Sequence, residues 1–509
     1  MHLLLAIDAG TTSVKAGLFA PNGRMLALAL EEYRLDTPSV ERAQLDPQIY
    51  WQACVRTVRH VIDQAGVEAR DIQALGVSSQ GETTITLDRE GLAIYPAIVW
   101  LDNRASDQAA RLSKEFASQI YDVCGIQEAI PTWTACKILW LRENEPEVFA
   151  RAWKFMLVQD FLIYRLTGQV VTDGSVASTT MLYDIRSHAW WTEMLAAIGL
   201  DPDRLPEILP PGSRVGTLKP EIAEVLGLDP ATIVVNGGMD QSSGAIGAGN
   251  ISPGTISEST GAALGIHATI SSPAMDPEKL IPVCYHSVPG KYLFAPVCPT
   301  AGMALKWLRD TFFREEIQAA RASQMNVYDL MTNLADQTTP GADGLLLLPH
   351  LMGAYSPVPN PAARGVFSGF TLSHGRGHFV RAVLEGVAFM LRQNLETIGR
   401  AGVPVHELRS TGGGSRSPLW NQIKADVCNL PLLTLASEDT ALLGDAILAG
   451  VASGMFRSVD EACKEMVVIK DKVLPGDQVG AYDLAYRRYC DLDDTLGGYF
   501  KRNYFEEPL

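Results

Sequence analysis

An acid, a glycine and three hydroxyl residues stand together just inside the N-terminus. They are Asp8, Gly10, Thr11, Thr12 and Ser13, and Lys15 follows two residues later. Glycine lets backbone N–H groups approach an anion, hydroxyls add donors, and an acid can hold Mg²⁺ through water. A tight turn in which Asp8 bonds the local backbone needs similar residues. This order of residues favours a phosphate-binding turn over that alternative.

A second acid follows two glycines near the middle of the chain. The segment Asn236–Gln241 contains Asp240, and small residues continue to Gly247. The glycines permit close approach of a ligand, and a carboxylate beside that ligand could act as a base. An acid that opens a helix is also a common N-terminal cap or dipole partner. The segment by itself leaves both roles open.

Consecutive glycines, Gly412–Gly414, precede a predicted helix start. Ser417 is a good N-cap and Pro418 fits the first helical position. Flat glycine backbone beside a helix start suits a nucleoside or a phosphate, although an ordinary structural turn needs the same residues. The chain contains neither a GxxxxGKS/T loop nor a GxGxxG pattern, so neither familiar nucleotide motif applies.

Polar residues also cluster after a predicted strand at Ala74–Val77. Gln80 and Glu82 lie in this loop, and Trp100 and Asp102 follow further on. A mixture of amide, carboxylate and aromatic groups suits a polyhydroxylated ligand. A helix cap at Asp102 and an ordinary packed Trp100 would explain the same residues, so the cluster alone does not decide between the two readings.

The elements that must position these residues alternate between strands and helices. The predicted elements of the first part are strands at Leu3–Asp8, Val14–Phe19 and Arg24–Leu30 and a helix at Pro47–Ala65. Tight turns between the strands predict an antiparallel meander. A similar strand–turn–strand unit recurs at Gly254–Thr260 and Ala262–His267. We therefore expect an α/β chain of two related halves, residues 1–249 and 250–509.

Length, charge and cysteine usage narrow the classes of partner. A chain of 509 residues exceeds the size of one hydrophobic core, and its formal net charge of −16 argues against nucleic acid or an anionic membrane as partner. The N-terminal apolar run is too short to span a membrane and lacks a basic leader. Eight scattered cysteines without a CxxC pair predict a reduced, cytoplasmic protein without structural zinc.

Taken in order, these motifs resemble the FGGY family of carbohydrate kinases over nearly the whole chain. Asp8–Ser13 and Ser257–Gly261 look like its two phosphate loops, and Asn236–Gln241 like its catalytic-base segment. Thr411–Trp420 resembles the adenosine segment, and Ala301–Asp310 resembles the helix that borders the nucleotide. Two further segments, Thr134–Trp140 and Gly365–Glu385, resemble the family signatures, with Thr132 and Phe370 off pattern.

The resemblance implies two ribonuclease-H-like domains, of the actin and Hsp70 type, that close over a central cleft. It implies transfer of the γ-phosphoryl group of Mg-ATP to a sugar hydroxyl, with Asp240 as the base and Asp8 holding Mg²⁺ through water. The implied cofactor-binding residues are Gly10, Thr11, Thr12, Ser13, Lys15, Thr260, Gly261, Gly302, Lys306, Gly413, Gly414 and Ser417. The candidate substrate residues are Gln80, Glu82, Trp100, Asp102, Asp240 and Gln241.

The acceptor loop departs from both branches of the family that it resembles. Pentulose kinases typically have Met-His-Gly where this chain has Gln80–Glu82, and glycerol kinase has an arginine at the position of Gly81. Gly81 would leave room for something bulkier than glycerol, so we expect D-xylulose or a related ketopentose. Alternatives are a polyol kinase acting on glycerol or erythritol, a non-catalytic actin- or Hsp70-type ATPase switch, and a sugar-sensing binding protein. The resemblance also makes a homodimer plausible.

Overall fold

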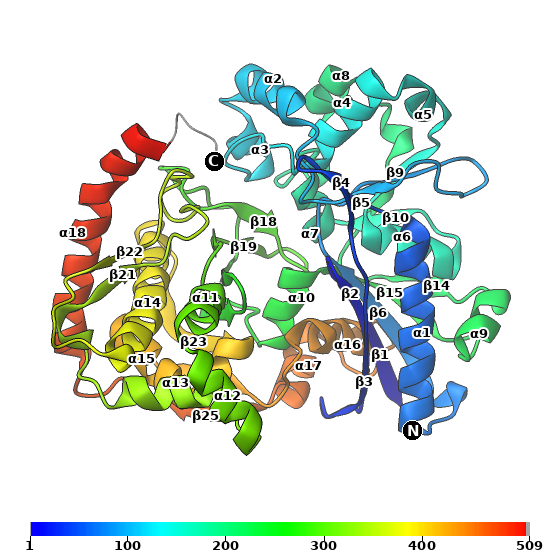
Figure 1. Cartoon of the computed structure of the whole chain (residues 1–509). Helices are drawn as coiled ribbons and strands as arrows, with labels where there is room; N and C mark the ends of the chain where they lie inside the picture. The colour runs from blue at the N-terminus through cyan, green and yellow to red at the C-terminus, as the bar shows by residue number, and fades with distance from the viewer. Residues whose placement is uncertain (1, 505–509) are drawn as a thin grey trace.

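The computed structural model describes residues 2–504, which form two α/β halves and a smaller helical group (Figure 1). The strands of the first sheet are, in spatial order, β14 (Arg214–Thr217), β15 (Ile233–Met239), β6 (Ile72–Ser79), β1 (Leu3–Ala9), β2 (Ser13–Phe19) and β3 (Met25–Glu32). Those of the second are β25 (Ile469–Val473), β24 (Leu432–Leu435), β23 (Val405–Thr411), β16 (Gly254–Thr260), β17 (Leu264–Ile270), β19 (Tyr292–Phe294) and β18 (Val283–Tyr285), with β20 (Val297–Cys298) also on β17. The predicted two-domain α/β class is confirmed.

The two sheets share one topology. In each sheet, three parallel strands lie side by side, an antiparallel strand flanks them at one edge, and an antiparallel meander continues at the other. Gly10 and Gly261 begin the turns that join the first two strands of each half. The duplication suggested by the repeated turns is therefore visible in the strand order of both sheets.

Helices cover both faces of the first sheet. α1 (Pro47–Ala65) and α6 (Val158–Thr167) pack with Leu5 and Ile7 on one face. α16 (Thr440–Ala452) comes from far along the chain and packs with Leu4 and Ala6 on the other face. The core of the first half is thus completed by a helix that lies beyond the predicted boundary at residue 249.

The bounds of α1 agree with the sequence prediction because both ends carry clear signals. Asp46 accepts a hydrogen bond from the Gln48 amide, and Pro47 occupies the first helical position. The helix ends at Gly66, whose φ of 62° is the left-handed conformation that glycine adopts without strain.

The other elements are distributed around the two sheets. The helical group contains α2 (Ser106–Phe116), α3 (Ile120–Cys124), α4 (Thr134–Asn144), α5 (Pro146–Arg151) and α8 (Thr192–Ile198). The remaining helices are α7 (Gly174–Ala177), α9 (Pro220–Leu226), α10 (Asp240–Gly247), α11 (Gly302–Phe312), α12 (Arg314–Ser323), α13 (Val327–Asp336), α14 (Arg376–Arg400), α15 (Pro418–Cys428), α17 (Val459–Met466) and α18 (Val479–Tyr504). The short strands are β4 (Asp36–Ser39), β5 (Arg42–Leu45), β7 (Ile85–Leu87), β8 (Ala97–Ile98), β9 (Lys154–Met156), β10 (Val171–Asp173), β11 (Tyr183–Asp184), β12 (Ala189–Trp190), β13 (Glu207–Leu209), β21 (Leu346–Leu348) and β22 (Val366–Ser368). Within residues 2–504 no helix is long and apolar enough to cross a membrane.

α10 and α16 lie against each other at the centre of the molecule (Figure 1). A Cβ on Gly444 would overlap the carbonyl oxygen of Ser243, and one on Gly247 would overlap that of Thr440. Only glycine at these two positions lets the helix backbones approach so closely. Because Asp240 is the first residue of α10, this contact also determines where the predicted base lies.

We expect Gly444→Ala to destabilise the protein by roughly 1–3 kcal/mol, because the added methyl group must push α10 away from α16. It should also lower kcat, because α10 carries Asp240. The matched control is Gly399→Ala in α14, where a Cβ meets nothing within 4 Å. Denaturant unfolding and turnover should show a loss only in the first variant, and wild-type behaviour of Gly444→Ala would show that the close approach is unimportant.

Candidate active site

Three parallel strands deliver polar residues to one edge of the first sheet. β1 carries Asp8 at its end, β6 runs into the Gln80–Thr84 loop, and β15 runs into Asp240. In the ladder, Asp8 pairs with Ser78 and Met239 pairs with Ser79. The carboxyl ends of parallel strands are the usual place for a ligand in an α/β sheet. Segments that are more than 150 residues apart in the sequence therefore meet at one site.

Asp8 is a buried acid in negatively charged surroundings. It is 6% exposed, and its Oδ1 accepts a hydrogen bond of 3.2 Å from the Ser78 hydroxyl. Burial and the charge of Asp439 raise the pKa of Asp8 to about 6, against the opposing effects of Lys15 and Ser78. An acid with this excess of negative charge suits a cation. No cluster of three metal-ligating side chains occurs in the part of the chain that the structure describes, and Asp8 stays the candidate for holding Mg²⁺ through water.

The predicted first phosphate turn is held from outside by two aromatic residues. Tyr33 donates its hydroxyl proton to the Gly10 carbonyl at 2.6 Å, and the Trp100 indole N–H donates to Thr11 Oγ1 at 2.8 Å. The Gly10 amide donates to the Ser13 carbonyl, while Thr12 is exposed. Trp100 was predicted to contact the substrate, but its polar group serves to hold this turn.

Lys15 is linked to a residue from the far end of the chain. Its ammonium lies 2.8 Å from Asp439 Oδ2, and Asp439 Oδ1 accepts a hydrogen bond from the Leu442 amide as the N-cap of α16. Lys15 is thereby placed at the phosphate turn by α16. The sequence analysis missed Asp439, although an acid directly before an apolar helix is a recognisable N-cap signal.

Asp240 lies at the start of α10, where the sequence allowed either a helix-terminal acid or a catalytic base. It opens α10 and its Oδ1 accepts a hydrogen bond from the Gln241 amide at 2.6 Å. Burial and then the charge of Asp8 raise the pKa of Asp240 to about 8. Gly238 before it has a φ of 142°, and a Cβ there would meet Ser175 Oγ at 2.7 Å. A half-buried carboxyl with a pKa near neutrality is what a general base requires.

Two histidines of the second half hold the start of α10. His267 Nε2 lies 3.0 Å from Gln241 Oε1, and His286 Nδ1 lies 2.8 Å from Ser242 Oγ. Burial lowers the pKa of His267 to about 4 and that of His286 to about 3, so both are neutral at physiological pH. The side-chain oxygen Oε1 of Gln241, a predicted substrate residue, is therefore already hydrogen-bonded within the protein.

Glu82 is the acid of the acceptor loop, and its backbone is strained. Its φ of 58° is uncommon for a residue other than glycine, and neighbouring side chains hold it there. The Thr179 hydroxyl accepts from its amide at 3.1 Å, and Lys137 donates to its carbonyl at 3.0 Å. Burial raises the pKa of Glu82 to about 7, and its charge also raises the pKa of Asp240. Its carboxyl group therefore lies close to the predicted base.

Gln80, in the same loop, has a hydrogen-bond partner for only one of its two side-chain polar atoms. Its Nε2 donates to the Tyr50 hydroxyl at 2.9 Å, while its Oε1 is buried without a hydrogen-bond partner among the described residues. A buried acceptor without a donor is uncommon and suits a ligand hydroxyl. Gln80 thus remains a candidate for substrate contact.

Two expectations about the acceptor loop are corrected by the structure. Asp102 is fully buried, and its two oxygens accept four hydrogen bonds, two from Arg104 Nε and Nη2 and two from the amides of Arg104 and Ala43. It orders the loop and has no oxygen free for a sugar. A Cβ on Gly81 would meet Thr179 Oγ1 at 2.7 Å, so this glycine allows close packing and does not enlarge the acceptor site.

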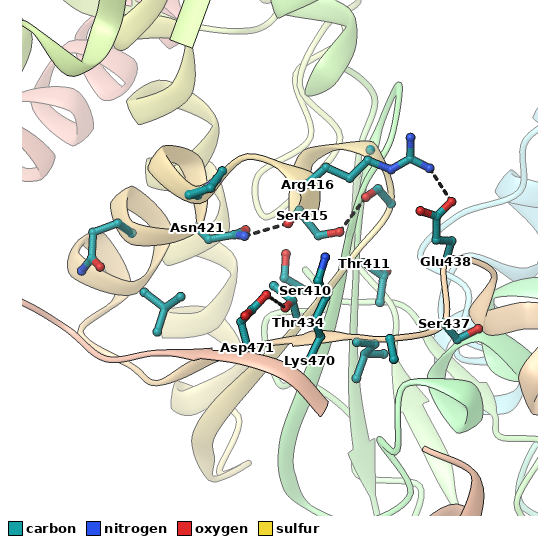
Figure 2. Close-up of a pocket in the computed structure, with 17 residues that line it drawn as sticks. Ser410, Thr411, Ser415, Arg416, Asn421, Thr434, Ser437, Glu438, Lys470 and Asp471 are labelled. Atoms are coloured by element: carbon teal, nitrogen blue, oxygen red, sulfur yellow. Dashed lines mark hydrogen bonds and ion pairs between the residues drawn. The ribbon is translucent and has the colours of Figure 1, made fainter. Parts of the chain in front are cut away.

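The predicted nucleotide residues gather at the carboxyl ends of the parallel strands of the second sheet. A cavity of about 550 Å³ opens beside β23, α15, β24 and the turn η5 (Gly413–Arg416) (Figure 2). Gly413 lines this cavity, whereas Gly414 is buried against Thr260. The Ser417 hydroxyl accepts from the Trp420 amide as an N-cap, as predicted. The cavity has a suitable size for a nucleoside.

The other nucleotide candidates lie around the second turn. The Gly302 amide, at the start of α11, donates to the Gly261 carbonyl at 2.9 Å, so these two residues are in contact. Lys306 is exposed, and its ammonium pairs with Asp310 at 2.9 Å on the same helix. The structure therefore brings Thr260, Gly261 and Gly302 together with the glycine-rich turn, whereas the ammonium group of Lys306 is paired with Asp310.

One further buried acid escaped the sequence analysis. Asp445 of α16 accepts a hydrogen bond of 2.8 Å from the Ser243 hydroxyl of α10, and its second oxygen is buried without a partner in the described chain. Burial raises the pKa of Asp445 well above its usual range. It lies in an apolar helix, where no local sequence signal distinguishes it from a surface acid.

Two α/β halves, each with a glycine turn after its first strand, and a carboxyl group of raised pKa at the strand ends of the first half are the arrangement expected of a two-domain phosphotransferase. Comparison with known proteins places this chain within that class. Residues 3–247 match the N-terminal domain of the FGGY family of carbohydrate kinases, and residues 259–453 match the C-terminal domain. The chain belongs to the FGGY family of carbohydrate kinases. It is a phosphotransferase with an alcohol group as acceptor, and this excludes the non-catalytic switch.

Named relatives differ in the sugar that they phosphorylate. Xylulose kinase from Bacillus subtilis is 30% identical over 467 residues, covering 92% of this chain and 91% of that protein. Gluconokinase from the same organism is 31% identical over 470 residues, covering 91% and 90%. The crystal structure of ligand-bound xylulose kinase from Lactobacillus acidophilus superposes with a TM-score of 0.90 at 25% identity, covering 99% and 100%. These comparisons leave the sugar undecided.

The depressed pKa of His267 predicts a measurable dependence of stability on pH. Between its usual pKa of 6.5 and about 4, the unfolded chain binds a proton that the folded chain does not, so stability falls as the pH falls. The variant His267→Gln keeps an amide that can donate to Gln241 but has no imidazole to titrate. As the pH falls through this window, we expect its free energy of unfolding to fall by about 1.4 kcal/mol less per pH unit than that of the wild type. Urea unfolding at several pH values measures the slopes, with the exposed His60→Gln as control. Equal slopes for wild type and His267→Gln would contradict the burial argument.

Proposed function

We propose that this protein transfers the γ-phosphoryl group of Mg-ATP to an uncharged ketose, with D-xylulose or a related ketopentose as the leading candidate. The observation that carries the proposal is the position of Asp240, which has a raised pKa and lies beside Glu82 at the edge where β1, β6 and β15 end. An acceptor hydroxyl at this edge would lie between a base and the phosphate turn at Gly10.

Asp240 is the residue that moves the proton. It takes the proton of the acceptor hydroxyl as the new bond from oxygen to phosphorus forms and the bond to the ADP leaving group breaks. Backbone donors at the turns of Gly10 and Gly261, together with Lys15, stabilise the charge on the transferring group. Mg²⁺, when bound near Asp8, supplies charge neutralisation for the phosphates.

The charge of the acceptor site favours a neutral sugar over an acid. The charges of Asp8 and Glu82 both act on Asp240, and the cations that face these acids are Lys15, which acts on Asp8 and Asp240, and Lys137, which acts on Glu82. An aldonate would bring another carboxylate into this site, where like charges repel strongly. We therefore favour the ketose of the xylulose kinases over the gluconate of the gluconokinases.

A polyol such as glycerol or erythritol is the second candidate, because the segment Glu82–Thr84 retains the Glu-Thr-Thr of the polyol branch. Gly81 no longer argues against it, since this glycine packs on Thr179. The homodimer and the domain boundary at residue 249 stay predictions.

Release of ADP with Mg-ATP against a panel of ketopentoses, polyols and gluconate tests the acceptor. We expect the strongest signal from one ketopentose. Activity with glycerol or a tetritol alone would show that the protein is a polyol kinase. A preference for gluconate would overturn the argument that the charge of the site favours a neutral sugar.

The role of Asp240 is tested by Asp240→Asn. We expect kcat to fall by a factor of about 10²–10⁴, the usual contribution of a general base, while ATP binding survives. ADP release measures turnover, and calorimetric titration with ATP measures binding. Near-normal turnover in the variant would refute the assignment.

The strain at Glu82 gives a prediction with two independent readouts. Glu82→Gly should leave stability unchanged or raise it by up to about 1 kcal/mol, because glycine adopts a φ of 58° without strain. The KM for the sugar should rise about tenfold or more through loss of the carboxylate. Glu90→Gly, in an exposed acid of the turn that follows β7, controls for loss of a charge. An unchanged KM would show that Glu82 does not contact the acceptor.

A further inference from the structure

A buried pair of opposite charges lies beneath the two predicted nucleotide turns. Glu258 is on β16 and Lys424 is on α15, and neither side chain is exposed to solvent. The ammonium nitrogen of Lys424 lies 2.7 Å from Glu258 Oε1. The pair cannot touch a bound nucleotide, because it is enclosed by protein on every side.

The pair is part of a hydrogen-bond network in which every N–H group of the Lys424 ammonium and both oxygens of the Glu258 carboxylate have a partner. Thr260 Oγ1 donates to Glu258 Oε2 at 2.6 Å, and the Ser410 hydroxyl donates to Glu258 Oε1. Lys424 also donates to Thr260 Oγ1 at 2.8 Å and to Ser410 Oγ at 3.5 Å. The three N–H groups of the ammonium each have an acceptor, and the carboxylate has three donors. Saturation of this kind holds the side chains in one arrangement.

The first half shows that the fold does not need charge at this position. Glu258 and Ile7 each stand three residues before the turn glycine of their half, Gly261 and Gly10. In the sheet, Glu258 pairs with Ser410, whereas Ile7 pairs with Val77. Both Ile7 and Val77 are fully buried apolar residues. Since a buried ion pair often stabilises a protein no better than apolar residues, stability alone does not account for Glu258 and Lys424.

Thr260 connects this network to both nucleotide turns. It ends β16 immediately before Gly261, and a Cβ on Gly414 would lie 2.6 Å from its methyl group. A Cβ on Gly412 would lie 2.9 Å from its carbonyl oxygen. The hydroxyl of Thr260 is fixed between Glu258 and Lys424 on its other side. The network therefore sets the position of the phosphate turn relative to the glycine-rich turn.

We propose that Glu258 and Lys424 are positioning residues that hold the turn at Thr260 and Gly261 against Gly412–Gly414, and so set the affinity for the phosphates of the nucleotide. The proposal rests on the placement of ATP at these turns under the proposed function. It requires no contact between the pair and the nucleotide. Its effect should appear in nucleotide binding and leave sugar binding unchanged.

The test separates positioning from stability. The triple variant Glu258→Ile, Ser410→Val, Lys424→Leu gives the second half the apolar character of the first. Because Ser410 also lines the cavity, the double variant described below, which keeps Ser410, must show the same change. We expect it to fold with a Tm close to that of the wild type, but with a Kd for Mg-ADP raised about tenfold or more, as small displacements of a binding turn commonly do. The KM for the sugar should change less than twofold. Calorimetric titration, thermal unfolding and steady-state kinetics provide the three readouts.

Two further variants keep the test decisive if the triple variant does not fold. Glu258→Gln with Lys424→Met removes both charges at nearly constant volume and should raise the Kd in the same way. Arg381→Met is the matched control, because Arg381 and Glu385 form a buried pair in α14 at 2.8 Å that contacts neither turn. It should lower Tm without changing the Kd for Mg-ADP.

The outcomes distinguish this inference from the proposed function. If the wild type binds Mg-ADP and a folded apolar variant binds it equally well, the pair is only structural and the inference is wrong. If the wild type does not bind Mg-ADP at all, the nucleotide placement fails and the inference fails with it. A control variant that weakens binding as much as the network variants would also overturn it.

Discussion

The close contact between α10 and α16 is the constraint on which the site depends. The two backbones approach so tightly at Gly247 and Gly444 that no side chain fits between them. α10 begins with Asp240, and α16 is capped at its N-terminus by Asp439, which holds Lys15 beside the predicted phosphate turn. The predicted base and the acid that holds Lys15 therefore lie at the starts of two helices whose close contact couples their positions. A backbone contact of this kind gives the positional accuracy that proton transfer needs, because it does not depend on flexible side chains.

The duplicated fold has been adapted to two different kinds of chemistry. In the first half the strand ends bring acids together, and burial raises the pKa values of Asp8 and Asp240, with a further rise from the charge of Asp439 at Asp8 and from that of Asp8 at Asp240. In the second half the strand ends present glycines and hydroxyls, and the buried charges of Glu258 and Lys424 balance each other. A site with excess negative charge suits a cation and a neutral acceptor. A neutral surface of backbone donors suits a nucleotide. Under the proposed function, one topology thus separates acceptor chemistry from nucleotide binding.

Local signals allowed much of this structure to be predicted from the sequence. The ends of α1 follow from Asp46, Pro47 and Gly66, and the cap at Ser417 was predicted from its neighbours alone. Long-range partners could not be predicted in this way. Asp439 lies 424 residues from Lys15, and Lys424 lies 166 residues from Glu258. Neither residue belongs to a pattern that identifies its partner.

The two wrong expectations have a common cause, because residue type does not reveal which way a side chain faces. Asp102 turns inward to Arg104, and the position of a side chain on Gly81 is taken by Thr179. Both corrections leave Glu82 as the acid that distinguishes the acceptor loop. Thr179 packs against Gly81 and binds the Glu82 amide, so the same contact that excludes a side chain at residue 81 holds Glu82 in its strained conformation. Strain maintained by neighbouring residues is expected where a side chain must face a ligand. The close packing of Gly81 and the strain of Glu82 thus share one cause, their contact with Thr179, and under the proposed function this contact directs the Glu82 carboxylate toward the acceptor.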